Sequence, residues 1–185
     1  MEEQNTQPAP SLVSHAVKHG VILGVISIVI VVLCYVVDLS MLATFKFLIF
    51  ILLVGLGYVI YSGINYRGEI GGYMPYGKAL QHGFLVLAIS GLVSTIFNLL
   101  LYNVIDPDMP QKLTDAIIAN TEEMMASFGA PQDTIDQQIA TMRTEMVNNF
   151  GVFGLIKSYL MALIWYAIIA LITSLFVRKN EPVEI

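Results

Sequence analysis

Four polar residues lie close together in the sequence and are the best candidates for chemistry: Arg67, Glu69, Lys78 and His82. They could form a polar site at the cytoplasmic mouth of the protein, and a membrane enzyme would have to use Arg67, Glu69 and His82. The alternative is a packed interfacial turn in which Arg67 and Lys78 anchor helix ends to anionic lipid headgroups. We treat the four as a candidate polar interfacial cluster and assign no catalytic residue.

Common catalytic and cofactor motifs do not occur in the sequence, which has no HExxH, GxSxG, P-loop or CxxC pattern. Methionine thioethers are soft ligands that suit copper(I). Four methionines raise that possibility: Met124, Met125, Met142 and Met146. Methionine is also a common flexible core filler, and no Cys or His lies near these four. We predict no enzyme activity, no metal and no cofactor.

The elements that must position these residues are four long stretches that are nearly free of charge. They cover about 19–37, 47–65, 82–105 and 152–177. A helix needs about 20 apolar residues to cross a bilayer. The chain is 56% hydrophobic and 12% charged, against about 45–50% and about 25% in soluble domains. Core helices of a soluble protein would need a polar shell that this sequence lacks. We therefore expect an all-α protein, a four-helix transmembrane bundle.

The only long segment outside these stretches, residues 106–151, is acidic. It has a net charge of −6, against −5 for the whole chain, so the rest of the protein carries +1. Asp108 before Pro110 indicates a helix start, Gly129 a stop and Pro131 a restart. The segment therefore predicts an amphipathic helical hairpin of two helices with about four turns each.

Apolar residues recur at helical spacing in both helices of this hairpin. The two expected faces are Leu113, Ile117, Met124 and Phe128, and Ile135, Ile139, Met142 and Met146. Two such faces cannot be buried by the hairpin in isolation. It should therefore cap the outer face of the bundle or dock another protein or a second copy of the chain.

The expected organisation is a membrane domain over 15–180 with short tails at 1–14 and 181–185. Four spans put both termini and the 65–82 loop on one side, which holds five of the nine Lys and Arg residues. Positively charged loops favour the cytoplasmic side. We predict cytoplasmic termini and an extracytoplasmic hairpin. The net negative charge argues against a nucleic-acid partner.

Small and polar residues inside the spans are the expected contacts between helices. Gly20 and Gly24 form a GxxxG pattern in the first span, which allows close helix approach. Asn98 in the third span is a candidate for interhelical hydrogen bonding, with substrate binding as the alternative.

Spans one and three begin alike, because 19–27 and 82–90 match at four of nine positions without gaps. This similarity suggests a duplicated two-helix unit with the hairpin inserted in the second copy. Parallel pseudo-symmetry of this sort occurs in some transporters. Chance similarity between apolar helices is the other explanation.

The most patterned stretch, 65–83, contains Gly71-Gly72 and Pro75, which predict a turn. Together with 105–108, it resembles domain-of-unknown-function family 4199. The positions that carry the resemblance are Arg67, Gly72, Tyr73, Gly77, Gly83 and Asp106-Pro107. The resemblance extends from about Ala16 to Lys179. It implies a four-span protein of the bacterial inner (plasma) membrane and supplies no activity, cofactor or catalytic residue.

Two functions remain as hypotheses. The first is a non-enzymatic accessory or interaction protein that binds a membrane partner, or a second copy, through the hairpin and the first span. The alternative is a small transporter or channel subunit that acts as an oligomer, since four spans enclose little space.

Overall fold

The computed structural model describes residues 10–182, and for residues 147 and 148 it describes the backbone alone. Within this range the chain is built from helices and the loops that join them. The α-helices are α1 (Leu12–Val37), α2 (Phe45–Glu69), α3 (Tyr76–Leu100), α4 (Met109–Ser127), α5 (Gln132–Asn149) and α6 (Val152–Val177). Two short turns complete the set, the 3-10 turn η1 (Leu39–Ala43) and the π turn η2 (Leu101–Ile105), which continues α3.

Four of these helices are long and apolar enough to cross a membrane: α1, α2, α3 with η2, and α6. The predicted four-span, all-α architecture is confirmed in this respect. The first span begins earlier than predicted, because the Ser11 hydroxyl caps α1 by accepting a hydrogen bond from the Ser14 amide at 3.2 Å. Residues 12–14 of the predicted tail are therefore helical, while residues 1–9 and 183–185 lie outside the described residues.

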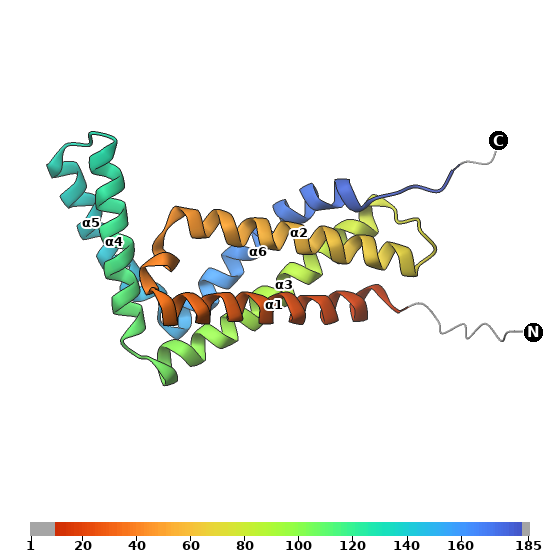
Figure 1. The fold of residues 1–185 in the computed structure, drawn as a ribbon, viewed down its shortest axis with the longest axis horizontal. Helices are drawn as coiled ribbons and strands as arrows, with labels where there is room; N and C mark the ends of the chain where they lie inside the picture. The colour runs from red at the N-terminus through yellow and green to blue at the C-terminus, as the bar shows by residue number, and fades with distance from the viewer. Residues whose placement is uncertain (1–9, 183–185) are drawn as a thin grey trace, which may run out of the picture.

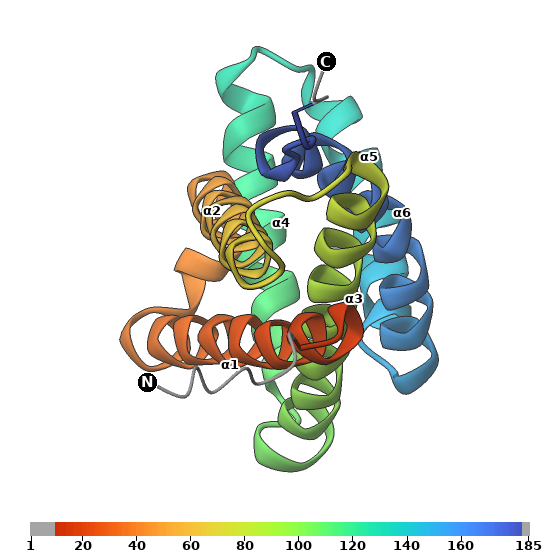
Figure 2. The same cartoon turned by 90° about the vertical axis from the view of Figure 1, so that its right-hand side faces the viewer.

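The four spans pack side by side, and Figure 1 places the start of α1 and the end of α6 at one end of the bundle. We call this the terminal end. The most extensive helix contacts join α1 to α3 and α3 to α6, while α2 makes smaller contacts with α1, α3 and α6. Seen from the terminal end, the four spans surround a common axis (Figure 2).

The hairpin of α4 and α5 lies at the opposite end, where it runs across the long axis of the bundle (Figure 1). The helix bounds match the predicted start, stop and restart, and Gly129 ends α4 with a φ of +75°. Such a φ strains any residue with a side chain and so favours glycine. The hairpin also packs on the bundle, α4 against η1 and α5 against α6.

The predicted apolar face of α4 is only partly correct. Leu113 is buried and Ile117 is half-buried, whereas Met124 and Phe128 are 49% and 84% exposed. The helix is anchored at its first half, where it contacts η1, so the apolar residues of its second half have no span to pack on. On α5, Ile135 is buried and the rest of the predicted face is at least partly covered.

At the terminal end, the loop between α2 and α3 holds the chain that leaves α6. Gly71 and Gly72 both have positive φ angles and form the predicted turn before Pro75. Met74 then exchanges two backbone hydrogen bonds with Lys179, at 2.8 and 2.9 Å. The loop between α2 and α3 and the segment after α6 are thus joined at this end of the bundle.

Candidate functional site

All three histidines of the protein meet at the terminal end of the bundle. His15 and His19 lie one turn apart on α1, and His82 lies on α3. Their exposures are only 4%, 8% and 1%, although histidine is a polar side chain. We call these three residues the histidine cluster.

A chain of hydrogen bonds runs through this cluster and ends on α2. His15 Nδ1 lies 2.9 Å from His82 Nε2, and His15 Nε2 lies 3.1 Å from the Asn65 carbonyl oxygen Oδ1. His19 Nδ1 shares a separate hydrogen bond of 3.0 Å with the hydroxyl of Tyr58. The cluster therefore ties α1, α2 and α3 together with polar contacts.

These contacts assign the protons of a neutral His15–His82 pair. Asn65 Oδ1 is an acceptor, so His15 Nε2 must donate to it, which leaves the lone pair of a neutral His15 on Nδ1. His82 Nε2 then donates to that lone pair, and a neutral His82 keeps its own lone pair on Nδ1. His82 Nδ1 is fully buried and has no hydrogen-bond partner among the described residues.

Aromatic rings enclose the cluster. The rings of His15 and His19 stack with their centroids 4.2 Å apart, and Tyr66 stacks on His82 at 5.3 Å and within 6° of parallel. Tyr66 is itself buried at 5% exposure. Because flat rings fill the space on both sides, the imidazoles have little freedom to turn.

One acidic and one basic side chain stand beside the cluster. The Glu69 carboxylate, at the end of α2, lies 3.8 Å from His15 Nε2 and is partly exposed. Lys18, next to His19 on α1, is exposed. The cluster therefore has one negative neighbour that could balance an added proton.

The structure divides the predicted polar interfacial cluster. Glu69 and His82 belong to the histidine cluster, since both flank His15. Arg67 instead donates from Nη1 to the backbone carbonyl of Val177 at 2.7 Å, at the end of α6. Lys78 is exposed, and within the described part of the chain its side chain forms no hydrogen bond or ion pair. Arg67 thus holds helices together, as the interfacial-turn interpretation expects.

The two glycines of the predicted contact face α3 within the same molecule. A Cβ atom added to Gly20 would lie 2.6 Å from Ile89 Cβ, and one added to Gly24 would lie 2.8 Å from Val93 Cβ. Glycine is required at both positions because α1 and α3 approach so closely. Asn98 is half-buried, and across residues 10–182 its side chain forms no hydrogen bond to another helix.

Sequence reasoning missed three members of the site: His15, Asn65 and Tyr58. His15 was placed in the membrane domain but before the first predicted span, although its spacing of four from His19 puts both imidazoles on one face of a helix. Asn65 and Tyr58 lie seven residues apart on α2, which is two helical turns. That pattern was available in the sequence, but the pairing of α1 with α3 was not.

No set of three or more His, Cys, Asp or Glu side chains in residues 10–182 is arranged to hold a metal ion. Around the histidine cluster the reason is local, because His15 and His82 direct nitrogens at each other. A metal ion would need those nitrogens to point at a common centre.

A second polar network lies at the hairpin end. Asp106 accepts hydrogen bonds from the Lys112 ammonium at 3.1 and 3.3 Å and from the Tyr35 hydroxyl at 2.9 Å. Lys112 and Tyr35 hold the pKa of the Asp106 carboxyl below its ordinary value, and Asp106 in turn raises the pKa of Lys112. This network fixes the start of α4 to the end of α1.

Comparison with known protein families gives one match. The family model described as "protein of unknown function" (DUF4199) matches residues 18–179, which is most of the chain. The comparisons with curated proteins and with solved structures gave no match. The chain belongs to the DUF4199 family.

Proposed function

We propose that this member of the DUF4199 family is a non-enzymatic membrane protein that responds to protons through its histidine cluster. The observation that supports this most is the hydrogen bond between the buried His15 and His82. Ionisable side chains inside membrane spans are rare and mark proton or ion pathways in many proteins. Here all three histidines of the chain gather at one such place.

An added proton does not fit the arrangement of the neutral pair. On His82 Nδ1 it would form a buried N–H that faces no acceptor. On His15 Nδ1 it would point at the N–H that His82 already donates. Either position leaves a buried donor unpaired, which destabilises a protein by about 1–3 kcal/mol. Proton uptake is therefore coupled to a movement of the helices or to the entry of water.

The charges around the cluster could accommodate one added proton but not two. The Glu69 carboxylate near His15 can balance one positive charge. Two charged imidazoles, on His15 and His82, would lie with nitrogens 2.9 Å apart and would repel each other. The response is thus a switch between a neutral and a singly protonated cluster.

The burial of the cluster supports a role other than catalysis. His82 is 1% exposed, and the rings of Tyr66 and His15 lie against it. A substrate could not touch this imidazole, whereas a proton can reach it along hydrogen bonds. The sequence patterns of common enzyme sites are missing as well.

Binding of a partner through the hairpin is the second and separate part of the proposal. The hairpin is strongly acidic and exposes Phe128 and Met124 near its tip. Gly20 and Gly24, which form the GxxxG pattern of the first span, pack against α3 and are therefore not available for contact with a partner. In our proposal the hairpin is extracytoplasmic, the termini are cytoplasmic, and the protein lies in a bacterial plasma membrane.

Crosslinking in native membranes tests the partner surface. Phe128→Glu should remove crosslinked products that wild type forms, because a charge replaces the exposed ring. Phe153→Glu, which changes a residue 90% exposed at the start of α6, is the matched control and should keep them. Unchanged products in Phe128→Glu would contradict a docking role for the hairpin tip.

A small transporter subunit is the second candidate function. The observation that favours it is a cavity of about 650 Å³ lined by all four spans. A proton-coupled transporter would link the histidine cluster to that cavity. Proton flux into vesicles containing the purified protein would support transport, and the absence of any flux would favour the accessory role.

The distance between α1 and α2 at the terminal end tests the proton response. Spin labels at Val13 and Ile64, both exposed, would report it in a Cys34→Ser background. We expect a longer or broader distance at about pH 5 than at about pH 8, the range in which imidazoles titrate. The His15→Gln/His82→Gln double variant should lose this change.

Two controls make the result specific. Lys78→Gln alters an exposed charge nearby and should keep the wild-type response. Labels at Leu33 and Leu48, toward the hairpin end, should report a distance that does not depend on pH. Identical wild-type distances at both pH values, or a response that survives in the double variant, would overturn the proposal.

A further inference from the structure

A cavity between the spans is lined by residues that are separate from the histidine cluster. Its volume is about 650 Å³, within the range of about 300–1,000 Å³ typical of ligand pockets. Every span contributes to its wall, for example Leu23 on α1, Leu52 on α2, Leu87 on α3 and Trp165 on α6. None of the lining residues is charged, and most are apolar.

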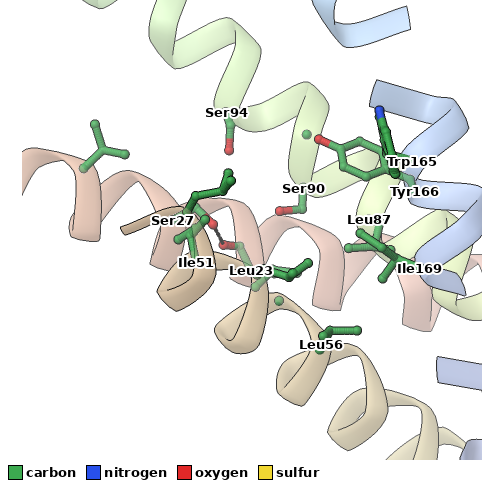
Figure 3. Close-up of a pocket in the computed structure, with 15 residues that line it drawn as sticks. Leu23, Ser27, Ile51, Leu56, Leu87, Ser90, Ser94, Trp165, Tyr166 and Ile169 are labelled. Carbon is green, nitrogen blue, oxygen red and sulfur yellow. Dashed lines mark hydrogen bonds between the residues drawn. The ribbon is translucent and has the colours of Figure 1, made fainter. Parts of the chain in front are cut away.

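Three hydroxyl groups on two helices face this apolar space. Ser90 and Ser94 lie one turn apart on α3, and Tyr166 lies opposite them on α6 (Figure 3). The Tyr166 ring lies over Gly91, where an added Cβ would come within 2.5 Å of its hydroxyl oxygen. Within residues 10–182, none of these three hydroxyls forms a hydrogen bond.

Several other hydroxyls of the bundle donate to backbone carbonyls. Ser27 lines the same cavity, but its hydroxyl donates to the Leu23 carbonyl at 3.0 Å. Thr95 donates to the Gly91 carbonyl at 2.8 Å, in the way usual for membrane helices. Tyr159, two turns before Tyr166 on α6, donates to the Ala88 carbonyl at 3.1 Å. Among the described residues, Ser90, Ser94 and Tyr166 lack such a bond, and all three line the same cavity.

These three hydroxyls lie deep in the bilayer, where a hydroxyl without a hydrogen bond destabilises the protein. At 1.5 Å per residue, Ser90 lies about 21 Å along a span of about 45 Å, near the middle of the bilayer. Hydroxyls without a partner in apolar surroundings destabilise a protein, so an occupant that supplies the missing hydrogen bonds would be favoured.

We propose that the cavity binds a neutral lipid-like molecule with a hydrocarbon body and one carbonyl or hydroxyl group. The hydrocarbon body matches the leucine and isoleucine side chains of the wall. The polar group meets Ser90, Ser94 and Tyr166, which can both donate and accept. The absence of charge among the lining residues selects a neutral polar group over a phosphate or a carboxylate.

The protein contains a built-in reporter, because its single tryptophan, Trp165, lines the cavity. Brominated lipids quench tryptophan fluorescence on contact. The protein in nanodiscs of unbrominated phosphatidylcholine is titrated with three brominated probes: methyl stearate, the hydrocarbon of the same length, and phosphatidylcholine. Trp165 is also 67% exposed, so lipid at the surface of the bundle adds quenching that rises with the brominated fraction without saturating. Above this background we expect saturable quenching by the ester, at least fivefold weaker binding of the hydrocarbon, and no saturable quenching by the phospholipid.

Variants then locate the polar contact. Ser90→Ala/Ser94→Ala should weaken ester binding by about tenfold, and Tyr166→Phe alone by about fivefold. Ser27→Ala is the matched control, because its hydroxyl is already bonded within α1, and it should bind as wild type does. The single change Tyr166→Phe tests the contact even where the double variant fails to fold.

Three outcomes would overturn the proposal. Equal binding of the ester and the hydrocarbon would show that the hydroxyls recognise nothing. Saturable quenching by brominated phosphatidylcholine would mean that an acyl chain of the bilayer fills the cavity. Wild-type ester binding in both hydroxyl variants would place the ester elsewhere.

Discussion

The two halves of the bundle are held together in different ways. In the terminal half, α1, α2 and α3 close around stacked rings and hydrogen-bonded imidazoles. From the middle of the bundle toward the hairpin end, the spans border an apolar cavity of about 650 Å³. The buried residues of α2 show the same contrast, since all four lie between Val59 and Tyr66, in its second half.

The difference shows what holds helices together in lipid. Lipid chains are as apolar as leucine, so apolar faces alone give the spans little reason to associate. Close packing at small residues and hydrogen bonds between helices supply that reason. The first half of α2, rich in Leu, Ile and Phe, has neither and remains largely exposed.

The same contrast bears on the suggested internal duplication. A repeated two-helix unit would pack α1 on α2 much as α3 packs on α6. Instead α3 and α6 have extensive contacts, while α1 and α2 have few and each pack mainly on other helices. The packing thus gives no support to the duplication, although His19 and His82 do meet in one cluster.

The largest expected effect comes from Gly20, where the terminal half is closest packed. Gly20→Leu should destabilise the protein by about 3 kcal/mol, because its side chain would collide with Ile89 and the Val86 carbonyl. Reversible unfolding in mixed micelles measures this loss. Gly57→Leu is the control on α2, where an added Cβ meets nothing within 4 Å, and equal losses in both variants would contradict the contrast.

A smaller loss is expected at Arg67. Arg67→Met removes the hydrogen bond to the Val177 carbonyl and should destabilise the protein by about 1–2 kcal/mol. The same unfolding assay applies, with Lys78→Met as a control that should have no measurable effect. Arg67→Met and Lys78→Met with equal stabilities would show that the contact to α6 is unimportant.

The Asp106 network predicts a dependence on pH at the hairpin end. The pKa of the Asp106 carboxyl is lower in the folded state than the ordinary carboxyl value of about 3.9, because Lys112 and Tyr35 donate hydrogen bonds to it. The stabilisation is therefore present above about pH 4 and is lost as the pH falls through the folded-state pKa. Melting temperatures of Asp106→Asn should decline less in acid than those of wild type, and parallel declines would contradict this.

The smallest effect is expected at Gly55, which lines the cavity on α2. An added Cβ meets nothing within 4 Å, so Gly55→Leu should change stability by less than about 0.5 kcal/mol. A loss as large as that of Gly20→Leu would mean that the hairpin half is as tightly packed as the terminal half.

The sequence predicts the helices well because their signals are local. Charge-free stretches define the spans, and Gly129 with Pro131 defines the turn of the hairpin. The α4 face was wrong at Met124 and Phe128 because periodicity shows only that two residues share a face. It does not show how far the neighbouring element extends.

The candidate site was less predictable because it depends on helix pairing. His82 and Glu69 are close in sequence and were identified, but their shared neighbour His15 lies on α1. Gly20 and Gly24 were identified as a contact, yet nothing local indicates that α3 is the helix they meet. The cavity hydroxyls on α3 likewise become a group only with Tyr166 on α6.

The most direct test of the proton-responsive cluster is nitrogen NMR of the imidazoles, which is simple because the chain has only three histidines. At neutral pH we predict protonated Nε2 and bare Nδ1 in both His15 and His82, and uptake of a single proton by the pair on acidification. A protonated Nδ1 on His82 at neutral pH, or independent uptake of two protons, would contradict the account.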